Sequence, residues 1–171
     1  MGARNALLGL GSNVGDRHAR LQSAVEALPD VGVQVLACSS TYDTDPVGEV
    51  SDQPSFLNAC LRAQTSLEPL ELLDAVKDLE RKLGRAEASV RHGPRAIDID
   101  ILTLGELELH DERMTLPHEQ LLTRRFVLIP ALELDFASST PAGERLADAL
   151  AALPLQEGVR WAGDPLQVPE D

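Results

Sequence analysis

The sequence predicts an α+β domain in which strands and helices follow one another in the order βαββαβ. Three observations predict it. The length of 171 residues suits one domain, several short runs alternate between apolar and polar residues as strands do, and two longer segments repeat apolar residues at helical spacing. A domain of this size can bury about two thirds of the surface of its unfolded chain. We therefore expect one domain over residues 1–171 with its own hydrophobic core.

The first half of the chain supplies a strand, a helix and two further strands. The run NALLGLG is typical of a short buried strand that ends at a glycine turn. In DRHARLQSAVEALPD, residues Leu21, Val25 and Leu28 recur at near-helical spacing, and Asp16 can cap the helix. The runs VQVLACSSTYDT and FLNACLRAQTS are β-branched and alternating, and a polar loop, DPVGEVSDQP, separates them.

The clearest helix is expected in SLEPLELLDAVKDLERKLG. Its apolar residues fall on one broad face, which also carries Glu80, and Gly84 can end the helix. The segment RAIDIDILTLGELEL then supplies the last strand of the core. This order of elements is that of a ferredoxin-like fold, an antiparallel sheet with helices on one face.

The remaining residues are expected to add to this core at its C-terminal end. RMTLPHEQLLTRRFVLIPALELD is typical of a loop followed by a short apolar helix, and AGERLADALAAL of a small helix. The tail from about residue 154 contains three prolines and has no periodicity. We expect the tail to be extended or mobile.

The charge of the protein limits the partners it can bind. The formal net charge is −13, which argues against general binding to nucleic acids or anionic membranes, because both need a basic surface. Between Lys77 and Arg95, however, basic residues outnumber acidic ones by six to three. A local cationic patch on an acidic protein favours a small anionic ligand.

The cysteines and the N-terminal segment indicate a reducing compartment. Cys38 and Cys60 lie in predicted strands without a metal-binding spacing, so we expect buried, reduced thiols. The segment MGARNALLGL has too short an apolar run for a signal peptide, and no apolar run reaches about 18 residues. We expect a cytoplasmic protein, acting as a monomer on small molecules.

Two aspartates in the stretch RHGPRAIDIDIL are candidates for a metal site. Asp98 and Asp100 are two residues apart on a predicted strand, so their side chains share a face at a spacing of roughly 6.5 Å. Mg²⁺ typically binds one or two carboxylates together with substrate phosphates. Arg85, Arg91 and Arg95 lie just upstream and could bind those phosphates. A solvated strand whose aspartates pair with these arginines is the alternative.

Two further segments could contribute ligand contacts. Gly11, Ser12 and Asn13 are expected in a turn between strand and helix, with backbone donors and an amide that can reach a ligand. The glycine spacing does not fit a dinucleotide-binding loop, and no Lys-Ser or Lys-Thr pair makes the segment a Walker loop. A purely structural turn is the alternative. His118 and Arg124 form a second set of possible phosphate donors.

Taken together, four segments resemble one enzyme family. GLGSNVGDR, DQPSFLNAC, HGPRAIDIDIL and LPHEQLLTRRFVLIPALEL occur in the order and spacing of the 6-hydroxymethyl-7,8-dihydropterin pyrophosphokinases of folate biosynthesis. The resemblance extends from about Leu7 to Leu134. It implies that the protein transfers a pyrophosphoryl group from ATP to the hydroxymethyl oxygen of the pterin and releases AMP.

The resemblance also implies roles for individual residues. Asp98 and Asp100 would bind two Mg²⁺ ions, Asp100 could take up the hydroxyl proton, and Arg85 and Arg95 would complete the catalytic set. The implied ATP-binding residues are Arg85, Arg91, Arg95, Ile101, His118 and Arg124. The implied pterin-binding residues, among which Phe56 and Phe126 would sandwich the ring, are Gly11, Ser12, Asn13, Thr44, Pro46, Val47, Phe56, Asn58 and Phe126.

The sequence departs from the family pattern at three positions. His92 stands where the family commonly has tryptophan, and Ala88 and Glu119 stand where some members carry a basic and an aromatic residue. Two alternatives to the family reading are a nucleotidyl- or glycosyltransferase with a D-x-D motif and a ferredoxin-like ligand-sensing module. The first usually needs a larger α/β domain, and the second has no need of two carboxylates facing three arginines.

Overall fold

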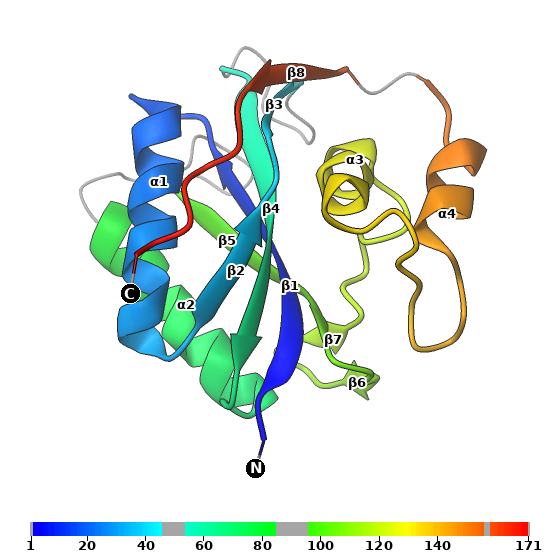
Figure 1. The fold of residues 1–171 in the computed structure, drawn as a ribbon, viewed down its shortest axis with the longest axis horizontal. Helices are drawn as coiled ribbons and strands as arrows, with labels where there is room; N and C mark the ends of the chain where they lie inside the picture. The colour runs from blue at the N-terminus through cyan, green and yellow to red at the C-terminus, as the bar shows by residue number, and fades with distance from the viewer. Residues whose placement is uncertain (1, 46–53, 85–95, 156–157, 171) are drawn as a thin grey trace.

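A computed structural model of the protein describes residues 2–45, 54–84, 96–155 and 158–170 (Figure 1). In chain order the elements are β1 (Arg4–Ser12), α1 (Arg17–Ala27), a 3₁₀ turn η1 (Leu28–Val31), β2 (Gln34–Cys38), β3 (Thr41–Thr44), β4 (Phe56–Thr65), α2 (Pro69–Gly84), β5 (Asp98–Leu104), β6 (Leu109–His110), β7 (Thr115–Leu116), α3 (Arg125–Leu134), α4 (Leu146–Ala152) and β8 (Val159–Gly163).

One antiparallel sheet forms the centre of the molecule. Its strands lie in the order β5, β1, β4, β3, β8, and β2 pairs with β4 beside β3. The helices α1 and α2 connect strands of this sheet, so the first six major elements follow the predicted βαββαβ order, with β2 and β3 sharing one partner strand. The predicted ferredoxin-like core is confirmed.

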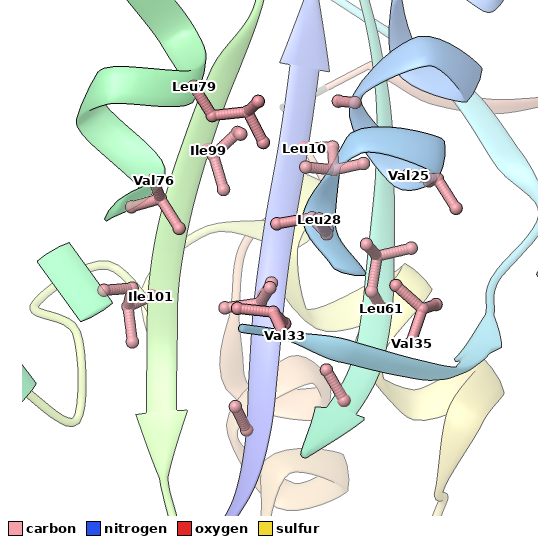
Figure 2. Close-up of a cluster of buried hydrophobic side chains, with 14 of the residues drawn as sticks. Leu10, Val25, Leu28, Val33, Val35, Leu61, Val76, Leu79, Ile99 and Ile101 are labelled. Atoms are coloured by element: carbon pink, nitrogen blue, oxygen red, sulfur yellow. The ribbon is translucent and has the colours of Figure 1, made fainter. Parts of the chain in front are cut away.

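The helices α1 and α2 cover one face of the sheet and enclose the larger hydrophobic core (Figures 1 and 2). Strand geometry sends alternate side chains to opposite faces, so Leu10 of β1 and Ile99 of β5 point into this core (Figure 2). Leu8 of β1 belongs to the same core. Asp16 caps α1 as predicted, because its carboxylate accepts the backbone N–H of Ala19 at 3.0 Å.

The helices α3 and α4 cover the opposite face of the sheet (Figure 1). Here α3 and α4 enclose a smaller apolar cluster that includes Cys60 of β4 and Leu102 of β5. Glu133 fastens α3 to the sheet, since its carboxylate accepts hydrogen bonds from the Tyr42 hydroxyl at 2.6 Å and from the Ser40 backbone N–H at 2.7 Å. The sheet is therefore covered on both faces.

The C-terminal tail supplies a strand that the sequence analysis did not predict. Strand β8 pairs with β3 and forms one edge of the sheet. Beyond it the chain crosses α1, where Leu166 is buried and Gln22 exchanges two hydrogen bonds of 2.9 Å with the backbone of Gln167.

Candidate active site

A cavity of about 420 Å³ lies between the sheet and α3. Its floor is formed by β1, β4 and β5, where Gly9 and Gly11 have no side chains to fill the space. Its walls carry carboxylates, a lysine, a histidine and two phenylalanines. The residues of this site cavity are Gly9, Leu10, Gly11, Thr44, Asp45, Phe56, Asn58, Ala59, Cys60, Lys77, Asp98, Asp100, Leu102, His118, Gln120, Phe126 and Val127.

The two aspartates of β5 lie on the cavity side of the sheet, as their spacing predicts. Asp98 pairs with Gly11 and Asp100 pairs with Gly9 in the antiparallel register of β1 and β5. Both side chains line the cavity and are half-buried. Ile99, between them, points to the opposite face and into the core. Two oxygen ligands of the kind that Mg²⁺ prefers therefore face the same space.

An ion pair from α2 supports this segment of β5. Lys77 Nζ lies 3.0 Å from Glu80 Oε1, and Glu80 Oε2 accepts the backbone N–H of Ile99 at 2.9 Å. Burial acts to lower the pKa of Lys77, but Glu80 and the nearby Asp98 and Asp100 outweigh it and raise the pKa. Lys77 is therefore a cation at neutral pH, beside both aspartates.

His118 reaches the cavity from the segment after β7. Its backbone N–H donates to the carbonyl of Leu102 at 2.9 Å, and its Nδ1 accepts the backbone N–H of Gln120 at 3.0 Å. Burial lowers the pKa of the imidazole. The neutral ring, with Nδ1 as an acceptor, carries its proton on Nε2, which can donate a hydrogen bond to an anion.

The other end of the cavity is suited to a flat, polar ring. Phe56 and Phe126 come from β4 and α3 and both line the cavity. Asn58 donates from Nδ2 to the Thr44 hydroxyl at 2.6 Å, which leaves Oδ1 as an acceptor. This oxygen lies over Gly11, because a Cβ atom at Gly11 would be only 2.7 Å from it. A heteroaromatic ring with N–H donors would fit between these groups.

A second hollow of about 350 Å³ adjoins the site cavity. The site cavity and the second hollow are both lined by Lys77, Asp100 and His118, so the two spaces meet at these three residues. Ile101 was predicted to contact ATP. It is 5% exposed, points to the face covered by α1 and α2, and lines this second hollow rather than the site cavity (Figure 2).

Of the predicted site residues, eight line the site cavity, namely Gly11, Thr44, Phe56, Asn58, Asp98, Asp100, His118 and Phe126. Four others among the described residues do not line it, and Ile101, described above, is one of them. Strand β1 continues through Ser12, whose buried side chain points away from the cavity, and Asn13 donates from Nδ2 to the Pro54 carbonyl at 3.2 Å. Arg124 is the N-cap residue of α3. The predicted contacts of Arg85, Arg91, Arg95, Pro46 and Val47 lie outside the described residues.

Sequence reasoning did not assign Lys77, Glu80 and Gln120 to the site. A signal was present for Glu80, since a charged residue on the apolar face of a predicted helix needs a buried partner. For Lys77 the signal was weaker, because the excess of basic residues from Lys77 onward indicates an anion site without selecting one residue. Gln120 donates its backbone N–H to His118 Nδ1. Almost any residue type could make this backbone contact, so the residue type at position 120 does not predict it.

Comparison with known proteins identifies the family of the chain. The family described as 7,8-dihydro-6-hydroxymethylpterin-pyrophosphokinase (HPPK) matches residues 7–136. The 2-amino-4-hydroxy-6-hydroxymethyldihydropteridine pyrophosphokinase of Methylorubrum extorquens is 44% identical over 86% of this chain and 92% of that relative. The Bacillus subtilis protein of the same name is 40% identical over 91% of this chain and 88% of that relative.

Some relatives are much longer than this chain. The folate synthesis bifunctional protein of Arabidopsis thaliana is 42% identical over 75% of this chain, which spans only 26% of that relative's length. The crystal structure of wild-type HPPK-DHPS of Plasmodium falciparum with pteroate matches 88% of this chain and 44% of its own chain. The two chains are 12% identical, and the TM-score of 0.70 shows that they share the fold. The length of the family match and the identity to relatives of similar size establish that the chain belongs to the 7,8-dihydro-6-hydroxymethylpterin-pyrophosphokinase family.

Proposed function

We propose that residues 1–171 form one pyrophosphokinase domain that transfers pyrophosphate from ATP to the hydroxymethyl group of 6-hydroxymethyl-7,8-dihydropterin in folate biosynthesis. One observation carries the proposal. A single cavity places Asp98 and Asp100 beside the cation of Lys77 at one end and Phe56 and Phe126 at the other. An anion-binding and metal-binding end thus adjoins an aromatic end, which is what a reaction between a nucleotide and a pterin requires.

The aspartate pair fits Mg²⁺ as the metal. Among the described residues no group of three or more His, Cys, Asp or Glu side chains could hold a metal ion. Mg²⁺ needs no such group, because it commonly takes one or two carboxylates and completes its shell with phosphate oxygens and water. Asp98 and Asp100 would hold two such ions, and the bound ions would neutralise phosphate charge.

The nucleotide would extend from the aspartates into the second hollow. Lys77 and the Nε2–H of His118 lie where the two hollows meet, so both can contact phosphate oxygens. Ile101 lines the second hollow, where it can contact the nucleoside. The family pattern adds a set of arginines as phosphate ligands, namely Arg85, Arg91, Arg95 and Arg124.

The pterin would lie at the aromatic end of the site cavity. Phe56 and Phe126 would stack on its two faces, Asn58 Oδ1 would accept one of its N–H groups, and Gly11 leaves room for the ring. The family pattern adds Ser12, Asn13, Thr44, Pro46 and Val47 to the pterin-binding region. The hydroxymethyl group would then point toward the aspartates.

In the proposed reaction the hydroxymethyl oxygen attacks the β-phosphorus of ATP. A new oxygen–phosphorus bond forms, the bond from the β-phosphorus to the oxygen bridging it to the α-phosphorus breaks, and AMP leaves with that oxygen. Asp100 takes up the hydroxyl proton. Lys77 and His118 donate to the phosphate oxygens, so positioning and charge stabilisation by the protein supply much of the rate enhancement.

The products of the reaction test the proposal directly. Purified protein is incubated with ATP, Mg²⁺ and 6-hydroxymethyl-7,8-dihydropterin, and the nucleotides are separated by chromatography. We expect one AMP per pterin consumed. Formation of ADP, or AMP formation that does not depend on the pterin, would overturn the proposed function.

We further propose that the protein works as a cytoplasmic monomer on small molecules and does not bind nucleic acid. The net charge of −13 supports the last point, since a phosphate backbone needs a basic surface. Within the described parts of the chain, no helix is both long and apolar enough to cross a membrane.

A further inference from the structure

Arg17 lies outside the site cavity but contacts two of the elements that form its aromatic end. It is the first residue of α1. Its guanidinium pairs with both carboxylate oxygens of Asp43 on β3, with Nη1 to Oδ1 at 2.8 Å and Nη2 to Oδ2 at 3.3 Å. Such a two-point contact fixes the angle between the groups as well as their distance.

The same guanidinium also holds the residue that precedes β4. Nη1 of Arg17 donates to the Ser55 carbonyl at 3.1 Å and to the Ser55 hydroxyl at 3.2 Å, and that hydroxyl donates to Asp43 Oδ1 at 2.7 Å. Arg17, Asp43 and Ser55, which we call the Arg17 cluster, therefore join α1, β3 and the start of β4 through a closed set of hydrogen bonds.

The residues that follow Asp43 and Ser55 in the chain form the aromatic end of the cavity. Thr44 follows Asp43 and Phe56 follows Ser55, and Thr44 and Phe56 pair with each other across the two strands. Thr44 in turn accepts the hydrogen bond from Asn58. A displacement of β3 relative to β4 at this point would disturb both the Phe56 ring, which is proposed to stack on the pterin, and Asn58 Oδ1, which is proposed to accept a hydrogen bond from it.

The cluster is sufficiently protected from water for its hydrogen bonds to constrain the strands. The side chains of Arg17 and Asp43 are 28% and 29% exposed. The hydrogen bond from Arg17 is the main cause of a lowered pKa of Asp43, and burial acts against it. The pair is ionised at neutral pH, so the contact is a charged one.

We infer that Arg17 is a positioning residue for the pterin. Arg17 sets the placement of Thr44 and Phe56 without touching the substrate. The inference rests on the proposed function. A small displacement of groups that bind and orient a substrate lowers its affinity, even when each group is retained. The nucleotide end depends on α2 and β5, whereas the hydrogen bonds of the Arg17 cluster described above join α1, β3 and the start of β4. The effect should therefore be confined to the pterin.

Steady-state kinetics of Arg17→Ala test this inference. We expect the KM for the pterin at saturating ATP to rise about tenfold, while the KM for ATP at saturating pterin and kcat each change less than about twofold. Arg4→Ala is the matched control, because Arg4 is also an ion-paired arginine, 24% exposed, at the opposite end of β1. Both KM values of the control should equal those of the wild type.

Two gentler variants keep the test decisive if Arg17→Ala does not fold. Arg17→Lys keeps the charge but loses the two-point contact, and Ser55→Ala removes one link of the cluster. Each should raise the KM for the pterin by a few fold, and adding Ser55→Ala to Arg17→Ala should raise it no further.

The outcomes separate this inference from the proposed function. An active wild type whose folded Arg17 and Ser55 variants show an unchanged KM for the pterin, or an equal rise in both KM values, would overturn the positioning role alone. A wild type that forms no pterin-dependent AMP would overturn the proposed function and the inference with it.

Discussion

The two faces of the central sheet are built from the same strands but carry different kinds of side chain. On the face covered by α1 and α2, Leu8 and Leu10 of β1 are at most 2% exposed and pack in the larger core (Figure 2). On the face toward α3, the alternate residues of the same strand are Gly9 and Gly11, and they leave a cavity. One strand therefore stabilises the fold with one set of residues and makes room for ligands with the other.

Strand β5 shows the same division more strongly. Ile99 and Ile101 point into the core, whereas Asp98 and Asp100 point into the cavity. Two carboxylates on one face repel each other, and the Lys77 cation beside them offsets only part of that repulsion, so they stabilise the fold little. The apolar face of the strand packs in the core and so holds the carboxylates in place. Substitutions on the cavity face should therefore lower activity, and substitutions on the core face should lower stability.

The largest effect is expected from Asp98→Asn or Asp100→Asn. Each removes a metal ligand of the proposed site, which should lower kcat at least about a thousandfold. The free energy of unfolding should change by less than about 0.5 kcal/mol, because no core contact is lost. Turnover assays and urea titrations measure the two quantities. Glu108→Gln, an exposed carboxylate beyond the end of β5, is the control, and wild-type turnover in either aspartate variant would exclude the proposed metal role.

The opposite result is expected on the core face. Leu8→Ala removes a side chain that is 0% exposed, which should lower the free energy of unfolding by about 3 kcal/mol through lost burial and a new cavity. Well below the melting temperature, kcat and both KM values should stay within about twofold of the wild type. Urea titration and steady-state assays at the same temperature check this. An inactive but stable variant would contradict the division between the faces.

A smaller effect is expected from Gly11→Ala on the cavity face. Its Cβ would lie 2.7 Å from Asn58 Oδ1, too close for any stable contact, so Asn58 must move away from its position over the ring site. We expect the KM for the pterin to rise about tenfold with little change in the KM for ATP. Gly9→Ala is the matched comparison, because it also adds a methyl group to the cavity, but its nearest neighbour would be Leu102 Cδ1 at 3.4 Å, an ordinary contact distance. Equal effects of the two substitutions would show that Asn58 does not position the pterin.

Much of this division could be predicted from the sequence. Alternation of apolar and polar residues placed Ile99 in the core and Asp98 and Asp100 on the other face, and helical spacing gave α1 and α2. The family prediction, which rested on four motifs in order, is confirmed by the family match over residues 7–136. These features are local, so the sequence records them directly.

Features that depend on contacts between distant segments could not be predicted in the same way. Strand β8 has only five residues, and it forms because β3 offers an unpaired edge. The position of Lys77 beside Asp98 and Asp100 depends on how α2 lies across β5. Ser12 was expected in a turn, but β1 extends through it and sends its side chain to the other face.

The smallest predicted effect concerns Asp43 on β3, the strand beside the edge strand β8. The hydrogen bond from Arg17 lowers the pKa of Asp43 below its ordinary value of 3.8. The unfolded chain therefore binds a proton at a higher pH than the folded chain does, so the contribution of Asp43 to stability is complete above pH 3.8 and is lost as the pH falls through the folded pKa. Asp43→Asn should be less stable than the wild type by up to about 1 kcal/mol at neutral pH, a modest value because the pair is partly solvated.

The difference between the wild type and Asp43→Asn should stay constant from pH 7 down to about pH 4 and shrink as the pH falls further, to about 2. Urea titrations of both proteins across this range measure it, and subtraction removes the acid sensitivity that the two proteins share. Asp78→Asn breaks a more exposed ion pair with Arg81, in which the two side chains are 58% and 70% exposed, and it measures the effect of losing a surface carboxylate. A gap between wild type and Asp43→Asn that stays constant over the whole range would mean that Asp43 contributes through its shape and not through its charge, so the Arg17 cluster would then not act as an ion pair.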